Sequence, residues 1–196
     1  MEEHFQIISV GNTEEKKVTE SSGLTKKEPG KIDERKAKLA TLRINNEKKN
    51  IQNAYEIGIF DKNEEQIEFT APNQWRLGIR GKPGTIWEGG LYCATITFPD
   101  DYPESPPHFE FDKDFEHVHI YSSGDVCLDL VNRELTYKPT TTMRIMIAEI
   151  IRLIHDKPNP KSPANTELNK LYLENVEQYE KKIRENAKKL ADKKLI

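Results

Sequence analysis

Four short segments with alternating apolar residues follow one another between residues 55 and 111, and they constrain the possible folds more than any other feature. The alternation falls at 55–59, 75–79, 92–98 and 108–111. A two-residue period is typical of β-strands with one buried face. Turn-forming residues separate the segments, and parallel strands would need crossover connections of about a dozen residues or more. The pattern therefore predicts a four-stranded antiparallel meander.

Helical segments flank these strands on both sides. Residues 32–49 are good helix formers with a partial apolar stripe that includes Leu39 and Leu42. The segment 143–155 is apolar on nearly all sides, as in a buried helix, and Thr142 is a plausible N-cap for it. Ser162, followed by a proline, predicts the start of one long surface helix. The order of elements predicts an α+β fold.

The first 30 residues differ in composition from the rest of the chain. The whole chain has 35% hydrophobic and 32% charged residues. Part of this low hydrophobic and high charged content comes from the first 30 residues, which contain charged runs and stretches with Ser, Gly and Pro. Such composition predicts a disordered N-terminal extension at 1–30 and a core domain at 31–196. An apolar island at 5–10 is either incidental or a strand-forming peptide that docks on a partner.

Charge and cysteine content exclude several classes of protein. The net charge of −3 and a pI near 6.0 argue against a general nucleic-acid binder. No apolar run approaches the ~18 residues of a membrane span, and no basic-then-apolar secretory signal is seen. The two cysteines, Cys93 and Cys127, indicate a reducing compartment. We expect an intracellular protein.

Chemically active side chains concentrate in an irregular segment between residues 115 and 139. Three interpretations of His117, His119 and Cys127 compete. A zinc site needs four ligands, or three and a water, and only Cys93 and His108 are spare candidates. A thiol beside an imidazole is also the arrangement of a Cys/His nucleophile, and a free cysteine is most often a core residue. The residues alone do not decide between the zinc site, the Cys/His nucleophile and the core cysteine.

Longer motifs in this region resemble a known family. Residues 84–92, 98–107, 121–130 and 157–164 are similar, in order and spacing, to the core of the ubiquitin-conjugating enzymes. The similarity extends from about residue 32 to 190, and the predicted meander with flanking helices agrees with that family's fold. Within the family, the segment 81–90 and the twelve-residue step from Cys127 to Pro139 are similar to the SUMO-conjugating type.

The resemblance implies a role for each candidate residue. Cys127 would carry the modifier as a thioester, and His119 would stand where the family has the asparagine credited with stabilising the oxyanion or its loop. The other implied roles are a structural role for His117, the lysine channel for Tyr121 and Ser162, and modifier binding for Arg35, Lys36 and Lys38. The implied partners are SUMO or ubiquitin, an activating enzyme, a ligase and protein substrates, in the cytoplasm and nucleus. No cofactor, metal, nucleic acid or membrane is implied.

Two departures from the family pattern leave alternatives open. His117-Val118-His119 replaces the family's His-Pro-Asn, and Asp125 lies where the SUMO type has an uncharged residue. The alternatives are a conjugating enzyme for ubiquitin or another modifier, and a catalytically weak variant that only binds a modifier.

Overall fold

The structure is a computed structural model that describes residues 34–126 and 137–196. Cys127 and the extension at 1–30 lie outside the described residues, so the division into an extension and a core domain at 31–196 stays a prediction. The described residues all belong to one compact unit. Among the helices of the described ranges, none combines the length and the apolar character needed to cross a membrane.

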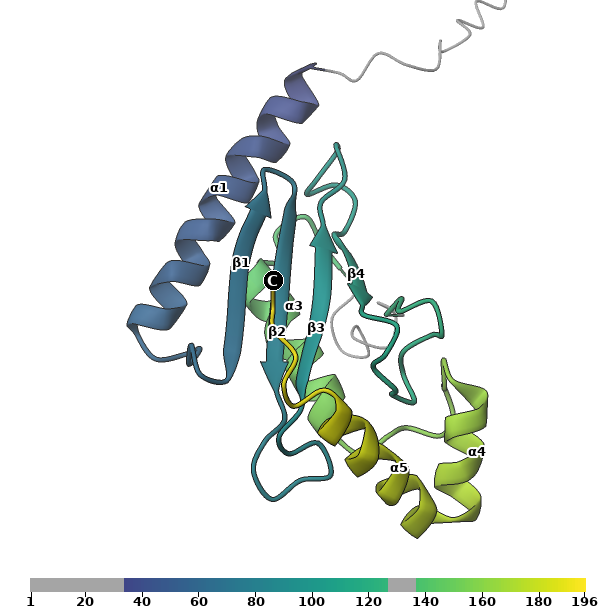
Figure 1. Ribbon diagram of the computed structural model, residues 1–196. Coiled ribbons are helices and arrows are strands. Elements are labelled where there is room, and N and C mark those ends of the chain that lie inside the picture. The colour runs from purple at the N-terminus through teal and green to yellow at the C-terminus, as the bar shows by residue number, and fades with distance from the viewer. Residues whose placement is uncertain (1–33, 127–136) are drawn as a thin grey trace, which may run out of the picture. The chain divides into compact units, whose positions relative to one another are not determined.

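A single antiparallel sheet organises this unit. Its strands are β1 (Glu65–Ala71), β2 (Gln74–Arg80), β3 (Leu91–Thr97) and β4 (His108–Phe111), and they lie side by side in chain order (Figure 1). Leu77 lies opposite Ala94, and Ile96 lies opposite Phe109. Alternate residues of β2 and β3 are fully buried on one face. The predicted meander and the α+β class are confirmed.

The first strand is not the one that the sequence pattern predicted. Helix α1 spans Glu34–Glu56, so Tyr55 belongs to its last turn. Ile57 and Ile59 lie in the following turn, where they are 63% and 45% exposed. The alternation at 55–59 is therefore incidental, because the helical face of α1 continues through Ile51 and Ala54, both buried in the core.

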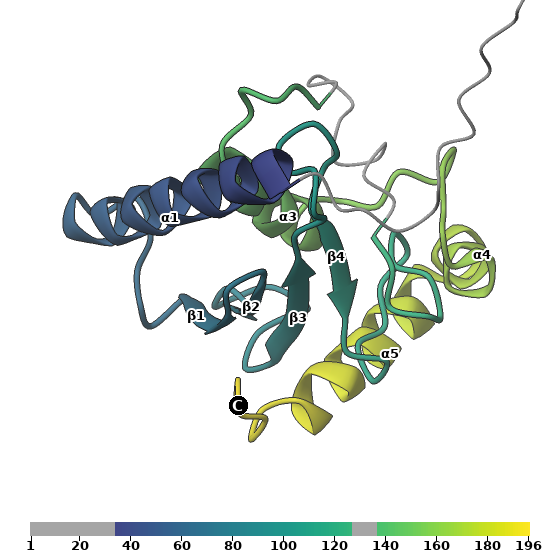
Figure 2. The same ribbon diagram turned by 90° about the horizontal axis from the view of Figure 1, so that it is seen from above.

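Helix α1 and helix α3 (Met143–His155) cover the same face of the sheet, as Figure 2 shows from above. The predicted bounds of α3 are confirmed. The predicted stripe on α1 is wrong for Leu39 and Leu42, which are 62% and 61% exposed, although Ala40, which also belonged to it, is buried. The buried face of α1 consists instead of Ala40, Ile44, Glu47, Ile51 and Ala54.

A buried carboxylate of α1 caps α3. Thr142 is the N-cap residue of α3, but its side chain makes no capping bond. The Met143 backbone N–H donates instead to Glu47 Oε2 at 3.1 Å. Arg43 donates to Glu47 Oε1 at 2.7 Å and to the backbone oxygens of residues 139 and 141. This pair ties α1 to the chain that re-enters the described structure after residue 136.

The C-terminal helical region consists of two helices, not the one that was predicted. Helix α4 (Thr166–Glu174) and helix α5 (Val176–Lys189) meet at Asn175. The side chains of Asn165 and Asn175 each accept a backbone N–H bond in the first turn of the helix that follows. These bonds satisfy amide groups that a helix start leaves free. Ser162 is therefore not the N-cap.

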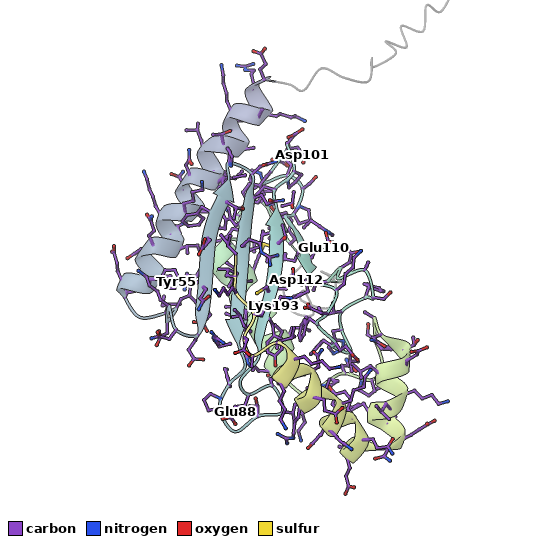
Figure 3. The ribbon with its side chains drawn as sticks, in the orientation of Figure 1. Tyr55, Glu88, Asp101, Glu110, Asp112 and Lys193 are labelled. Atoms are coloured by element: carbon purple, nitrogen blue, oxygen red, sulfur yellow. The ribbon has the colours of Figure 1, made fainter. Side chains whose placement is uncertain are left out.

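The last residues of the chain cross the opposite face of the sheet (Figures 1 and 2). Leu195 packs against Leu91 and Cys93 in a small cluster of its own. The Lys193 ammonium lies 2.9 Å from Asp112 Oδ2 and also pairs with Asp114. Lys193 and Asp112 are labelled in Figure 3. Burial raises the pKa of the Cys93 thiol, which suits a structural residue rather than a nucleophile.

Candidate active site

The segment that contains the two histidines is held by the connection between α3 and α4. The Val118 carbonyl oxygen accepts hydrogen bonds from the backbone N–H groups of Ala164 and Asn165, both at 2.9 Å. Val118 itself is fully buried. The chain therefore has a defined position here although it belongs to no helix or strand.

His117 lies in the aromatic core. Its ring centroid is 5.1 Å from that of Trp87 and 5.9 Å from that of Phe115, and the residue has no exposed surface. Its Nδ1 accepts the backbone N–H of His119 at 3.0 Å. Burial, together with smaller contributions from nearby His119 and His155, lowers the pKa of His117 to about 3. The imidazole is therefore neutral near pH 7 and supports the turn on which His119 lies.

His119 is also almost completely buried, with 4% of its surface exposed. The backbone N–H of Asn159 donates to its Nε2 at 3.0 Å. This contact joins the histidine segment to the loop 157–164, whose sequence contributed to the family resemblance. Sequence reasoning did not single out Asn159 as a functional residue, because a backbone donor leaves no side-chain signature.

A tight turn follows and leads to Cys127. The Tyr121 N–H donates to the Asp125 carbonyl at 3.1 Å, and Val126 forms an antiparallel bridge with Ile120. Gly124 takes the left-handed φ of 98°. A Cβ at that position would lie 2.0 Å from the carbonyl oxygen of a β4 residue, so only glycine fits. Val126, which precedes Cys127 in the sequence, thus pairs with the residue that follows His119.

Asp125 is held in place by its neighbours. The Ser123 hydroxyl donates to Asp125 Oδ2 at 2.6 Å, and Asp125 Oδ1 lies 3.0 Å from Nε2 of His108 on β4. The carboxylate is partly exposed. An acidic group thus lies two residues before Cys127 on a surface that also carries an imidazole.

Tyr121 and Ser162 occupy different places. Tyr121 is 45% exposed and lines a groove of about 550 Å³ together with Asn165, Leu168 and Leu171 at the start of α4. Ser162 is exposed on the loop before α4 and is not among the residues that line this groove. Its backbone N–H donates to the Asn159 carbonyl, the residue that also contacts His119. Ser162 is thus joined through Asn159 to His119.

The basic residues of the first helix lie apart from these histidines in the sequence. Arg35, Lys36 and Lys38 are exposed on the first turns of α1. The nearby Arg43 and Glu47, which sequence reasoning missed, anchor the chain just after residue 136. Their i, i+4 spacing with opposite charges was a signal in the sequence, although such pairs occur on many solvent-exposed helices.

Comparison with known proteins agrees with this arrangement. The family model described as ubiquitin-conjugating enzyme matches residues 43–187, which include both histidines, the Gly124 turn and the loop around Asn159. The chain belongs to the ubiquitin-conjugating enzyme family. As a member, it is a transferase that conjugates a ubiquitin-like modifier.

Individual relatives are similar in sequence to this chain over much of its length. A SUMO-conjugating enzyme, ubc9, of Dictyostelium discoideum is 38% identical over 153 residues, which cover 78% of this chain and 96% of the relative. The SUMO-conjugating enzyme SCE1 of Arabidopsis thaliana is 37% identical over 58% of this chain and 71% of its own. A crystal structure of a candidate ubiquitin conjugating enzyme from Plasmodium yoelii superposes with a TM-score of 0.66 and 32% identity, covering 78% of this chain and 95% of that one.

Proposed function

We propose that this conjugating enzyme carries SUMO as a thioester on Cys127 and transfers it to a substrate lysine. Family membership is the observation that carries the proposal, and the curated relatives reported above are named as SUMO-conjugating enzymes. Cys127 directly follows Val126 in the sequence, and Val126 pairs with Ile120, the residue after His119, which supports this role. This proposal replaces the zinc and protease interpretations of the histidine segment.

The reaction proceeds by two acyl transfers. The Cys127 sulfur attacks the thioester carbonyl that joins the modifier to an activating enzyme, a new C–S bond forms, and the thiol of the activating enzyme leaves. The lysine nitrogen of a substrate then attacks the same carbonyl carbon. The C–N bond forms, the C–S bond to Cys127 breaks, and the amine loses its proton to solvent. In the second step, we assign Tyr121 and Ser162 to the approach of the lysine.

A charging assay tests both the modifier and the cysteine. The full chain is incubated with ATP and either SUMO or ubiquitin, each with its matched activating enzyme. We expect a SUMO adduct that a thiol reductant removes, and Cys127→Ser should give an oxyester that resists the reductant. Cys93→Ser is the matched control and should charge normally, because Cys93 lies under the C-terminal residues on the outer face of the sheet. If only ubiquitin forms an adduct, the modifier is ubiquitin rather than SUMO. If neither forms an adduct, the proposed catalysis is refuted.

We also propose that the modifier binds to the exposed basic residues of α1. Changing Arg35, Lys36 and Lys38 together to alanine should slow charging, with the largest difference from wild type at low salt. The matched control is a triple alanine variant at three exposed lysines of α5, namely Lys181, Lys188 and Lys189. Equal charging rates for the two triple variants would contradict this assignment.

We further propose that the enzyme works in the cytoplasm and nucleus.

A further inference from the structure

A pocket lies between the connection from β2 to β3 and the C-terminal helices. Its volume is about 310 Å³, near the lower limit of the roughly 300–1,000 Å³ that is usual for ligand sites. Its walls come from residues 85–87, from residues 155–158 at the end of α3, and from α4 and α5. Arg184 of α5 donates to the Thr85 carbonyl oxygen at 3.3 Å, which joins two of these walls. The pocket is thus built from three separate parts of the chain.

The lining of this pocket is mainly apolar. Its apolar and aromatic members are Ile86, Trp87, Pro158, Tyr172, Val176 and Tyr179. Val176 is 49% exposed, and Leu173, three residues earlier, is 61% exposed. Exposed apolar residues next to an apolar pocket are typical of surfaces that take an anchoring side chain from a partner protein.

The charged side chains of the lining differ in their pairing. Asp156 pairs with Arg152 at 2.9 Å, and Glu180 pairs with Arg184 at 3.3 Å. Lys157 is exposed and forms no ion pair with any residue of the ranges 34–126 and 137–196. The unpaired charge at the edge of the pocket is therefore positive.

The one histidine of the lining adds no charge near pH 7. The backbone N–H of Lys82 donates to Nε2 of His155 at 3.2 Å, so this nitrogen is unprotonated. Nδ1 lies 2.8 Å from the Ile151 carbonyl oxygen, to which it donates. Burial also lowers the pKa of His155. The ring therefore contributes a neutral wall.

We propose that this pocket is a docking site for a segment of a partner protein that inserts one aromatic or long aliphatic side chain and places a carboxylate beside Lys157. The apolar walls match the anchoring side chain, and the unpaired ammonium matches the carboxylate. The Trp87 ring lies 5.1 Å from that of His117, and Pro158 precedes the residue whose N–H contacts His119. A partner at this site would therefore touch two segments that support the histidines. The proposal does not depend on which modifier the enzyme carries.

Small probes of this chemistry can be tested on the full chain. The probes are 3-phenylpropionate and its neutral amide, 3-phenylpropanamide. The chain has two tryptophans, and Trp75, at the other end of β2, does not line the pocket. In ¹H–¹⁵N spectra we expect the indole N–H signal of Trp87 to shift to saturation while that of Trp75 stays in place; a Trp87→Phe variant assigns the two signals.

The charge of the probe tests the role of Lys157. The acid should bind roughly two- to fivefold more tightly than the amide, and this difference should decrease at high salt. Lys157→Gln should remove the preference for the acid and leave the affinity for the amide unchanged. Lys161→Gln is the matched control, because Lys161 is exposed on the same loop but does not line the pocket.

A pocket-filling variant tests the place of binding. Val176→Trp puts a large side chain at the half-exposed edge of the pocket and should abolish binding of both probes. An unchanged Trp75 signal shows that this variant is folded. If it binds the probes as well as the wild type does, the pocket is not the binding site.

Two blocked dipeptides, acetyl-Glu-Phe-amide and acetyl-Phe-Glu-amide, distinguish a protein segment from a small molecule. Binding of either one at least as tight as that of 3-phenylpropionate supports a protein partner. If 3-phenylpropionate binds and neither dipeptide does, the pocket takes a small aromatic acid and the proposal is wrong. Absence of any Trp87 shift, equal affinities for the acid and the amide, or an unchanged preference in Lys157→Gln would also overturn it.

Discussion

Replacing His117 with asparagine should make the stability of the protein much less sensitive to mild acid. Burial holds the pKa of His117 at about 3 in the folded state, whereas an unfolded chain has a histidine pKa of about 6.5. Between these values the unfolded state binds a proton that the folded state does not, so stability falls as the pH falls. From pH 7.5 to pH 5 this single residue should remove about 2 kcal/mol of unfolding free energy.

Asparagine is a suitable replacement because its side-chain oxygen can accept the His119 N–H in place of Nδ1. The variant loses ring contacts with Trp87 and is expected to be less stable at every pH. The relevant quantity is therefore the change in unfolding free energy between the two pH values, measured by urea denaturation. Burial also lowers the pKa of His155, but that contribution is present in both proteins and cancels in the comparison.

The wild type, measured at the same two pH values, is the reference for this comparison. If His117→Asn loses as much stability between pH 7.5 and pH 5 as the wild type does, then His117 is not the buried neutral group described above.

Three further pairs of substitutions test the packing of the fold by urea denaturation. Glu47→Ala should cost about 3 kcal/mol, because the arginine and the backbone N–H that it pairs with lose their acceptor, while Glu47→Gln should cost less; equal costs would argue against a role for the charge. Gly124→Ala should cost at least about 3 kcal/mol, because a left-handed conformation and a backbone clash coincide. Gly58→Ala shares the left-handed conformation but has open space around it, so a similar loss there would contradict the clash. Leu195→Ala should cost about 2 kcal/mol and Ile196→Ala, 74% exposed, less than about 0.5; no difference between them would mean that the C-terminal residues do not pack on the sheet.

Much of the fold could be predicted because its pattern is local. The alternation in β2, β3 and β4 and the apolar run of α3 each reflect burial of one element against the core, which a sequence records directly. The errors occurred where local patterns compete. At residues 55–59 a two-residue alternation coincided with the end of a helix, and at Asn175 a capping side chain divides what reads as one apolar stripe.

The candidate site was recognised in the sequence from motifs rather than from contacts. The sequence by itself determined which side chains are available: a cysteine after a glycine turn, a histidine at the family's usual position, a second histidine in place of the family's asparagine, and an asparagine between prolines. Only the tertiary structure decided their states. It buried His117 among aromatic rings, so that this histidine stays neutral, and it directed the Asn159 amide at His119. Both effects depend on residues far apart in the chain, since desolvation and backbone hydrogen bonds arise only once those segments pack together.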